Sequence, residues 1–361
     1  MRPTIMEVDI QKFNMNIDKI QKYVGNKILM PVIKANAYGT YINKNLEVIN
    51  KFDIVAVAIV DEAIELRKLG YEKEIFILNQ PYIEEIENII KYNITIGISD
   101  NLFLEEILKI KEKIKVHLEI ETGMNRTGIK IEDLKDFIDK IKQNQNIIVE
   151  GCYTHLSSAD YDKDYTNKQL EIFRKAVEII KDNFDTIKYI HSSASNGIIN
   201  YNDNISNMVR PGIIMYGYES FENAKEKIDV EPICKLKTKI TFIKEIGQDV
   251  SISYSRKFIT KKNMKIATIP IGYADGLRRQ LSNKGTVIVN NQKAQILGNI
   301  CMDSCMIDVT DIENVEVGTD VYIWDNNIRT LEDIAKECDT INYEILSTIS
   351  YRVPRIFINR S

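Results

Sequence analysis

The chain contains 361 residues, of which 44% are hydrophobic and 28% are charged, and its formal net charge is -4. A chain of this length can form two domains with a large apolar core. The small net charge gives no electrostatic reason to expect binding to nucleic acid or to an anionic membrane surface. No apolar run is long enough to cross a bilayer, and the N-terminal segment MRPTIMEVDIQKF lacks the apolar core of a secretory signal.

Five cysteines are scattered along the chain, at positions 152, 234, 301, 305 and 338. An odd and scattered set argues against a disulfide framework and favours a reducing, cytoplasmic location. Cys301 and Cys305 are four residues apart, but the sequence shows no third and fourth ligand for a zinc site. We therefore interpret them as ordinary thiols and expect no metal.

Short β-branched apolar runs recur through the first two thirds of the chain, with helical patterns between them. Most runs are continuous rather than alternating, which is typical of strands buried on both faces. The segment 61–70 begins with acidic residues and ends at Gly70, as a capped helix does. The predicted strands are residues 28–33, 54–60, 74–79, 94–98, 115–121, 147–155, 188–195 and 208–217.

Eight strand–helix units are the number found in a closed parallel (β/α)8 barrel of TIM type. We therefore predict an α/β fold with such a barrel over residues 10–230. A doubly wound open sheet is the alternative, although the Gly-rich dinucleotide loop that usually follows its first strand is missing.

Beyond about residue 230 the pattern changes to successive alternating strands, interrupted by one helical stretch at residues 331–338. This change predicts a separate, mostly antiparallel β domain over residues 231–361. Its predicted strands are residues 235–243, 265–271, 286–297, 304–309 and 320–324.

Reactive side chains follow the ends of several predicted barrel strands. In such a barrel the C-terminal strand ends meet at one mouth, where active sites lie. Taken singly, each residue has a structural explanation, such as a solvated lysine, a structural histidine, or an arginine paired with Glu119 or Glu121. Together they favour a site for a small anionic ligand. They are Lys34, Arg126, His155, Ser195 and Arg210.

The local sequences resemble those of the alanine racemase family over nearly the whole chain. PVIKANAYG (31–39) resembles the lysine segment that binds pyridoxal phosphate in that family. One such segment is a weak signal, but many in the family's order are a strong one. The resemblance implies a pyridoxal-phosphate barrel followed by a β domain, to which residues 1–9 contribute a strand. The other matching segments are MEVDI, ETGMNRTG, NMVRPGIIMYG, IPIGYADG, GNICMDSCM and TINYEILSTISYRVPRIF.

The resemblance implies a two-base mechanism. Lys34 would form a Schiff base with pyridoxal 5'-phosphate and, once released by the substrate amine, exchange the α-proton of the D-amino acid. Tyr254 of the partner subunit would serve the L-form from the opposite face, in a homodimer with shared active sites. Aligning the family's Val-Ser-Tyr-Gly on Val250 instead would place Ile252 there, which cannot carry a proton. The structural alternative for Tyr254 is a tyrosine that packs at a domain junction.

The resemblance also implies binding roles. Arg210 would face the ring nitrogen of the cofactor and, because an arginine only donates, leave it unprotonated and a weak electron sink. Arg126 would hold the substrate carboxylate. The other cofactor contacts would be Tyr38, His155, Ser195, Gly212, Ile213 and Tyr351. The other substrate contacts, Met302, Asp303 and Tyr273, belong to the partner subunit's second domain.

Four positions depart from the family's usual sequence. Thr40 and Tyr41 replace a His-Gly pair, and Ser255 replaces a glycine. Glu119 stands where many members have a carbamylated lysine. We hypothesise that its carboxylate orients Arg126 directly; a barrel glutamate in an unrelated ion pair is the alternative.

The expected activity is the interconversion of L- and D-alanine, which would supply D-alanine for peptidoglycan. A serine or broad-specificity racemase is the main alternative because of the departures at 40, 41 and 255, although Tyr351 favours a small apolar substrate. A basic amino-acid decarboxylase would show a Gly-rich phosphate loop that we do not find. A pyridoxal-phosphate carrier protein would lack the second domain.

Overall fold

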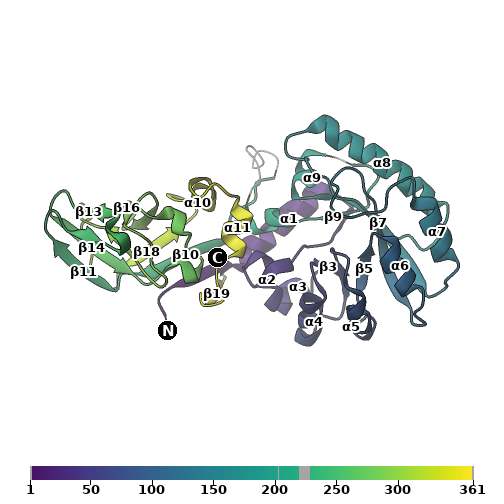
Figure 1. Cartoon of the computed structure of the whole chain (residues 1–361), viewed down its shortest axis with the longest axis horizontal. Coiled ribbons are helices and arrows are strands. Elements are labelled where there is room, and N and C mark those ends of the chain that lie inside the picture. Colours follow the sequence, from purple (N-terminus) through teal and green to yellow (C-terminus); the bar gives the residue numbers. More distant parts are fainter. Residues whose placement is uncertain (1, 202, 219–227, 360–361) are drawn as a thin grey trace. The chain divides into compact units, whose positions relative to one another are not determined.

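A computed structural model describes residues 2–201, 203–218 and 228–359; residues 1 and 361, which end the predicted ranges, lie outside the described residues. The chain divides into two compact units (Figure 1). One consists of Met15–Ala37 and Ile42–Val230, and the other of Met1–Asn14, Tyr38–Tyr41 and Glu231–Ser361. The predicted ranges did not anticipate that the short segment Tyr38–Tyr41 groups with the second unit.

The first unit is built on an eight-stranded parallel sheet with the order β2-β9-β8-β7-β6-β5-β4-β3. A parallel bridge between Val32 and Ala56 joins its two edges, so the sheet forms a nearly closed barrel. The predicted (β/α)8 barrel is confirmed, and the open doubly wound sheet is not what forms. The strands are β2 (Ile28–Leu29), β3 (Ile54–Val57), β4 (Glu74–Ile77), β5 (Thr95–Ile98), β6 (Ile114–Glu119), β7 (Ile147–Tyr153), β8 (Tyr189–Ala194) and β9 (Met208–Arg210).

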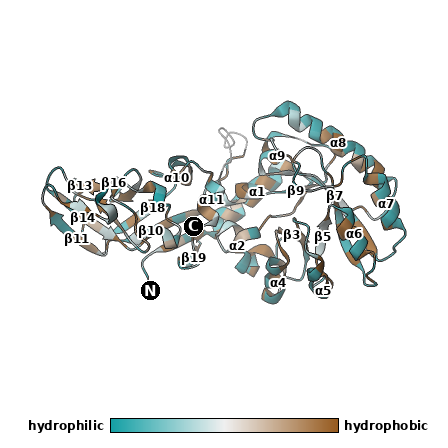
Figure 2. Cartoon of the chain, in the orientation of Figure 1, coloured by the Kyte–Doolittle hydropathy of each residue, from teal (hydrophilic) through white to brown (hydrophobic). Residues whose placement is uncertain are grey.

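Amphipathic helices lie on the outer side of these strands (Figure 1). The predicted capped helix is α4 (Val60–Leu69), which has two acidic residues in its first turn and ends at Gly70 with φ 103°. In Figure 2 the longest helix, α8 (Lys163–Lys181), carries both hydrophilic and hydrophobic stretches, because only one of its faces is buried. The remaining helical elements up to residue 216, not all of which lie on the outer side, are α1 (Ile10–Val24), α2 (Lys34–Tyr38), α3 (Leu46–Ile49), α5 (Ile86–Lys91), α6 (Asn101–Ile107), α7 (Leu134–Lys142) and α9 (Ser195–Asn200), with 3-10 turns η1 (Ile42–Lys44), η2 (Ile83–Glu85) and η3 (Ile213–Tyr216).

The second unit contains a nine-stranded sheet with the order β11-β14-β17-β16-β15-β18-β10-β1-β19. All its pairings are antiparallel except that of β1 with β19. The N-terminal strand β1 (Ile5–Asp9) therefore lies in this sheet, between β10 and β19. The other strands are β10 (Cys234–Lys239), β11 (Phe242–Ile246), β14 (Met264–Ile269), β15 (Thr286–Val289), β16 (Gln292–Leu297), β17 (Cys305–Asp308), β18 (Asp320–Trp324) and β19 (Arg355–Ile358).

Two runs that the sequence predicts as single strands each form two strands in the structure. The run 286–297 is the hairpin β15–β16, whose turn residues Asn290 and Asn291 have φ 48° and 60°. Two consecutive asparagines favour such a left-handed two-residue turn. The run 235–243 is divided between β10 and β11. The smaller elements are β12 (Ser251–Ile252) and β13 (Phe258–Ile259), which pair with each other, the helices α10 (Leu331–Glu337) and α11 (Asn342–Ser347), and the turns η5 (Tyr254–Arg256), η6 (Tyr273–Asp275) and η7 (Arg279–Leu281).

Among the described residues, no helix has both the length and the apolar character needed to span a membrane. Within the same ranges, no group of three or more His, Cys, Asp and Glu side chains could hold a metal ion. All five cysteines are free thiols.

Candidate active site

Lys34 begins a turn of left-handed helix at the C-terminal end of the first barrel strand. Ala35, Asn36 and Ala37 have φ values of 51°, 53° and 52°, and Tyr38 follows with 56°. A left-handed conformation costs a non-glycine residue roughly 1–2 kcal/mol, so surrounding contacts must hold this turn in place. Strain of this kind is typical of functional sites.

Glu62, in the first turn of α4, supplies one of these contacts. Its Oε1 accepts a hydrogen bond from the backbone N of Ala35 at 2.6 Å, and its Oε2 accepts one from Ala58 N at 2.8 Å. The carboxylate thus ties the lysine turn to the segment that follows β3. Sequence reasoning missed this role, although the acidic start of the segment 61–70 was a usable signal.

The environment of Lys34 favours an uncharged amine. Burial lowers the pKa of Lys34, the positive charges of Arg126 and Arg210 lower it further, and the carboxylate of Glu62 acts in the opposite direction. At neutral pH a larger fraction of this amine is therefore neutral than in a free lysine. The neutral amine is the form that attacks a carbonyl carbon.

Arg126 lies exposed on the loop after β6. It lines a small pocket together with Glu119, Thr154 and His155, among others. Within the described ranges, no ion pair joins its guanidinium to a carboxylate. The Glu121 carboxylate instead accepts hydrogen bonds from backbone N–H groups of its own loop. The guanidinium is therefore available to an anionic ligand.

Glu119 ends strand β6 and is only 3% exposed. Its Oε2 is buried without a hydrogen-bond partner in the described structure. Burial raises the pKa of Glu119, whereas the neighbouring Thr127 hydroxyl, the positive charge of Arg126 and the Tyr153 hydroxyl lower it. Glu119 and Arg126 thus interact electrostatically without a direct ion pair.

Arg210, at the end of β9, is almost completely buried, with 1% exposure. Its Nη atoms make five hydrogen bonds, at 2.8 to 3.3 Å, and Nε takes part in none of them. Burial lowers the pKa of Arg210 to about 10, so the guanidinium stays protonated at neutral pH. The five acceptors are the carbonyls of Thr154, His191 and Ser192 and the Nδ1 atoms of His155 and His191.

His155, after β7, is neutral in this setting. Burial lowers the pKa of His155 to about 3, and the nearby charges of Arg210 and Arg126 contribute to the shift. Because Arg210 donates to its Nδ1, the ring proton lies on Nε2. The structure therefore brings Lys34, Arg126, His155 and Arg210 into one electrostatic neighbourhood at the barrel mouth.

Ser195 lies at the start of α9. Its Oγ accepts hydrogen bonds from the backbone N of Gly212 at 3.1 Å and of Ile214 at 3.4 Å, and Ile213 lies between them in the chain. Hydroxyl and backbone N–H groups gathered in this way suit the oxygens of a phosphate group.

The remaining predicted residues lie in the second unit, and most are exposed. Tyr38 is the exception, with 9% exposure and its ring centre 6.0 Å from that of Tyr343. Large exposed aromatic and methionine side chains mark surfaces that meet another chain or a ligand. The exposed fractions are 69% for Tyr254, 44% for Tyr273, 52% for Met302 and 84% for Tyr351.

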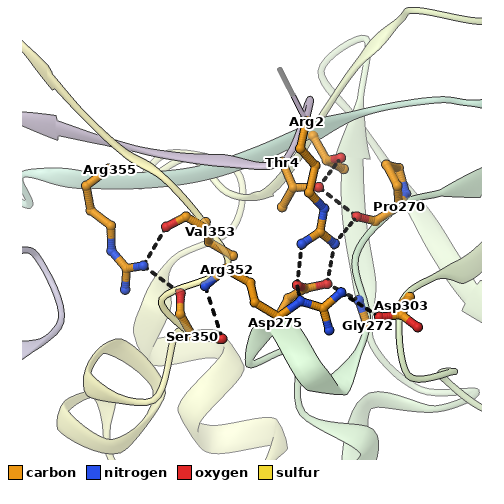
Figure 3. A network of polar contacts seen from close by, with 11 residues as sticks. Arg2, Thr4, Pro270, Gly272, Asp275, Asp303, Ser350, Arg352, Val353 and Arg355 are labelled. Atoms are coloured by element: carbon orange, nitrogen blue, oxygen red, sulfur yellow. Dashed lines mark hydrogen bonds and ion pairs between the residues drawn. The ribbon is translucent and has the colours of Figure 1, made fainter.

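An ion-pair network holds three of these residues' loops together (Figure 3). Both Nη atoms of Arg2 bind the buried Asp275 carboxylate at 2.5 Å. Arg352 places its Nε 3.6 Å from the same carboxylate and donates from Nη2 to Asp303 Oδ1 at 2.6 Å. Asp275, Asp303 and Arg352 each lie within two residues of a candidate side chain, so the network fixes their loops relative to one another. The side chains are Tyr273, Met302 and Tyr351.

The loop of Tyr254 is strained on both sides of the tyrosine. Ser253 has φ 64° and ψ -173°, and Ser255 has φ 62° and ψ 12°. The Asn299 side chain donates to the Tyr254 carbonyl at 2.9 Å and helps to hold this conformation. A positive φ explains why a glycine at position 255 would suit this turn. Tyr41, the other residue at which the resemblance implies a glycine, also has a positive φ, and the Arg355 guanidinium lies 4.5 Å from its ring centre.

The variant Ser255→Gly is expected to raise the free energy of unfolding by about 1 kcal/mol, because glycine adopts the left-handed conformation without strain. Ser255 is exposed, so the change removes little packing. Urea denaturation would measure the gain. The matched control is Ser251→Gly in the neighbouring strand β12, where no gain is expected. Equal midpoints for the wild-type protein and Ser255→Gly would contradict the assignment of strain.

Family models match both units of the chain. Residues 8–220 match "Alanine racemase, N-terminal domain", and residues 233–357 match "Alanine racemase, C-terminal domain". The chain belongs to the alanine racemase family. The family predicted from the sequence segments is thereby confirmed.

Relatives and solved structures agree over the full length. The chain is 41% identical to an alanine racemase of Clostridium perfringens and 39% identical to alanine racemase 2 of Caldanaerobacter subterraneus, covering 99% and 100% of this chain and 96% of each relative. Its fold superposes on an alanine racemase of Clostridium difficile with a TM-score of 0.93 at 34% identity, covering 100% of this chain and 97% of that one. An alanine racemase of Bacillus anthracis with bound L-Ala-P gives a TM-score of 0.93 at 30% identity, covering 100% of this chain and 96% of that one.

Proposed function

We propose that this protein is an alanine racemase that interconverts L- and D-alanine with pyridoxal 5'-phosphate as its cofactor, and that its D-alanine serves peptidoglycan synthesis in the cytoplasm. The proposal rests on one observation at the barrel mouth. The pKa of the Lys34 amine is lowered there by burial and by the charge of Arg126, and Arg126 forms no ion pair with a carboxylate among the described residues. The family membership supports the same activity, and a solved relative is a complex with cycloserine.

The side chains and backbone groups at the barrel mouth match the functional groups of pyridoxal phosphate. The Lys34 amine, whose pKa is lowered by burial, suits the aldehyde, and the Ser195 hydroxyl with the amides of Gly212 and Ile213 suits the phosphate. The hydrogen bonds of Arg210 come from its two Nη atoms. Its Nε–H can therefore face the ring nitrogen of the cofactor. The hydroxyls of Tyr38 and Tyr351 would join the phosphate contacts, and the neutral His155 ring would lie against the cofactor ring. When bound, the cofactor would draw electrons from the α-carbon and make its proton removable.

Two groups of the protein would then move the α-proton. Lys34 Nζ would exchange it on the D side, and Tyr254 Oη of the partner subunit on the L side, which inverts the centre. Arg126 would hold the substrate carboxylate, together with the backbone of Met302 and with Asp303 beside it, both from the partner subunit. Tyr273 of the partner subunit would line the entrance. The exposure of the side chains in the second unit supports such a homodimer.

The test is racemisation itself, followed by circular dichroism with L-alanine, L-serine and L-lysine as substrates. Alanine is expected to give the largest kcat/KM, because Tyr351 keeps an aromatic ring where a smaller polar residue would admit serine. Preferential turnover of serine would favour the broad-specificity alternative. No change in optical activity with any amino acid, in protein that binds pyridoxal phosphate, would reject a racemase.

Replacing Glu119 by glutamine is expected to raise KM for alanine several-fold and to change kcat less. The carboxylate interacts electrostatically with Arg126, so its loss would leave the guanidinium less well oriented toward the substrate. Steady-state kinetics would measure the split between KM and kcat. Glu132→Gln, at an exposed residue of the same unit, is the matched control. An unchanged KM would leave Glu119 with a structural role only.

A further inference from the structure

Behind Arg210, two histidines continue its hydrogen bonds into the barrel interior. His117 on β6 and His191 on β8 are both 0% exposed. Arg210 Nη1 lies 2.8 Å from His191 Nδ1, and His191 Nε2 lies 2.9 Å from His117 Nδ1. The three side chains form one unbroken chain from the guanidinium to the core.

The chemistry of arginine fixes the direction of every bond in this chain. A guanidinium has donors only, so His191 Nδ1 must accept and the ring must carry its proton on Nε2. That N–H donates to His117 Nδ1, so His117 also carries its proton on Nε2. Burial, reinforced by the charge of Arg210, lowers the pKa of His117 to about 3 and that of His191 well below its ordinary value. Both rings are therefore neutral single tautomers.

The chain ends on a buried polar atom that has no partner. His117 Nε2 makes no hydrogen bond within the described ranges. Leaving such a donor unpaired costs about 1–3 kcal/mol, so barrel stability alone does not account for a histidine here. The surrounding residues accommodate the ring closely. Phe76 stacks on it with ring centres 4.5 Å apart, and a Cβ on Gly151 would lie 3.0 Å from it.

We propose that His117 is a positioning residue that acts through His191 to hold the Arg210 guanidinium in its observed orientation. With an acceptor at His117 Nδ1, His191 satisfies its own N–H and presents a lone pair to Arg210. Without that acceptor, the His191 Nε2–H is left unpaired, and the observed arrangement loses its advantage over two others. A flipped ring would turn the Cδ2–H toward the guanidinium, and the other tautomer would turn an N–H toward it. Arg210 then loses an acceptor at Nη1, and its Nε is no longer fixed.

This inference concerns the orientation of Arg210; only its effect on catalysis rests on the proposed function. Two variants separate the hydrogen bond from the packing. In His117→Asn the side-chain oxygen replaces Nδ1 as an acceptor, whereas His117→Leu fills the space without one. The chain has three histidines, so nitrogen NMR of the holoprotein labelled with 15N only at histidine can resolve every ring.

In the wild-type protein, His117 and His191 are expected to show the neutral pattern with the proton on Nε2, unchanged between about pH 5 and pH 8. His117→Asn should keep this pattern for His191 and keep kcat/KM for alanine within about threefold. His117→Leu should change the His191 pattern and lower kcat/KM by about tenfold or more, which is about 1.4 kcal/mol of transition-state free energy.

A wild-type spectrum in which either ring carries its proton on Nδ1, or titrates within this range, would overturn the proposal. A His117→Leu protein with the wild-type His191 pattern and full activity would overturn it as well. The spectrum of the wild-type protein needs no variant, so poor folding of either variant cannot remove the test. If the protein racemises no amino acid, the proposed function fails while the tautomer result still decides the inference.

Discussion

Replacing Lys34 by alanine is expected to lower the rate of alanine racemisation by at least about 10³-fold, because one side chain would supply both the covalent attachment and one of the two proton carriers. Burial lowers the pKa of Lys34 and so favours the neutral amine, which is the form that both tasks need. The variant should keep the fold, since the lysine side chain is not a core residue. Borohydride reduction of the wild-type protein with pyridoxal phosphate, followed by peptide mapping, should place the label on residue 34.

Lys168→Ala is the matched control for this experiment. Lys168 is exposed on α8 of the same unit and has no assigned role. Its loss should leave both the rate and the labelling unchanged. A label on a different lysine, or a Lys34→Ala protein that retains most of its activity, would show that the amine at the first strand end is not the reacting group.

The barrel could be predicted because its signal is local. Strands such as β3, with the sequence IVAV, are buried on both faces and must be continuously apolar, so each one is visible in the sequence. The capped helix α4 could be predicted for the same reason, since Gly70 and the acidic first turn mark its two ends. The run 286–297 is predicted as one strand but forms the hairpin β15–β16, although Asn290 and Asn291 interrupt its apolar pattern and favour a turn.

The contacts that hold the candidate site could not be predicted, because they join residues far apart in the sequence. Arg2 binds a carboxylate 273 positions away, and Arg355 donates to the carbonyl of Gly39. The His117–His191 contact depends on the relative positions of two barrel strands. The strain of the lysine turn was also hidden, since KANAY contains no glycine and gives no sign of a left-handed path.

Replacing Tyr254 by phenylalanine is expected to lower racemisation by about 10²- to 10⁴-fold, because it removes one of the two proton carriers. Proton exchange on D-alanine and conversion to L-alanine should respond differently to this change. In heavy water, D-alanine should still take up deuterium at its α-carbon through Lys34, but almost no L-alanine should form. Tyr161→Phe, at a tyrosine that is 89% exposed in the other unit, is the matched control. Loss of deuterium uptake along with racemisation would show that Tyr254 is not a base for one face only.

The partner-subunit assignment of Tyr254 can be tested by combining the two inactive variants. If Lys34→Ala and Tyr254→Phe chains are co-expressed in equal amounts, half of the dimers are hybrids, and each hybrid contains one complete site and one that lacks both groups. Random pairing should therefore restore about one quarter of the wild-type activity per dimer. If instead each site took both residues from its own chain, no hybrid would contain a complete site and no activity would return. The recovered fraction thus distinguishes shared sites from separate ones, because only a shared site can be complete when the two chains carry different inactivating variants.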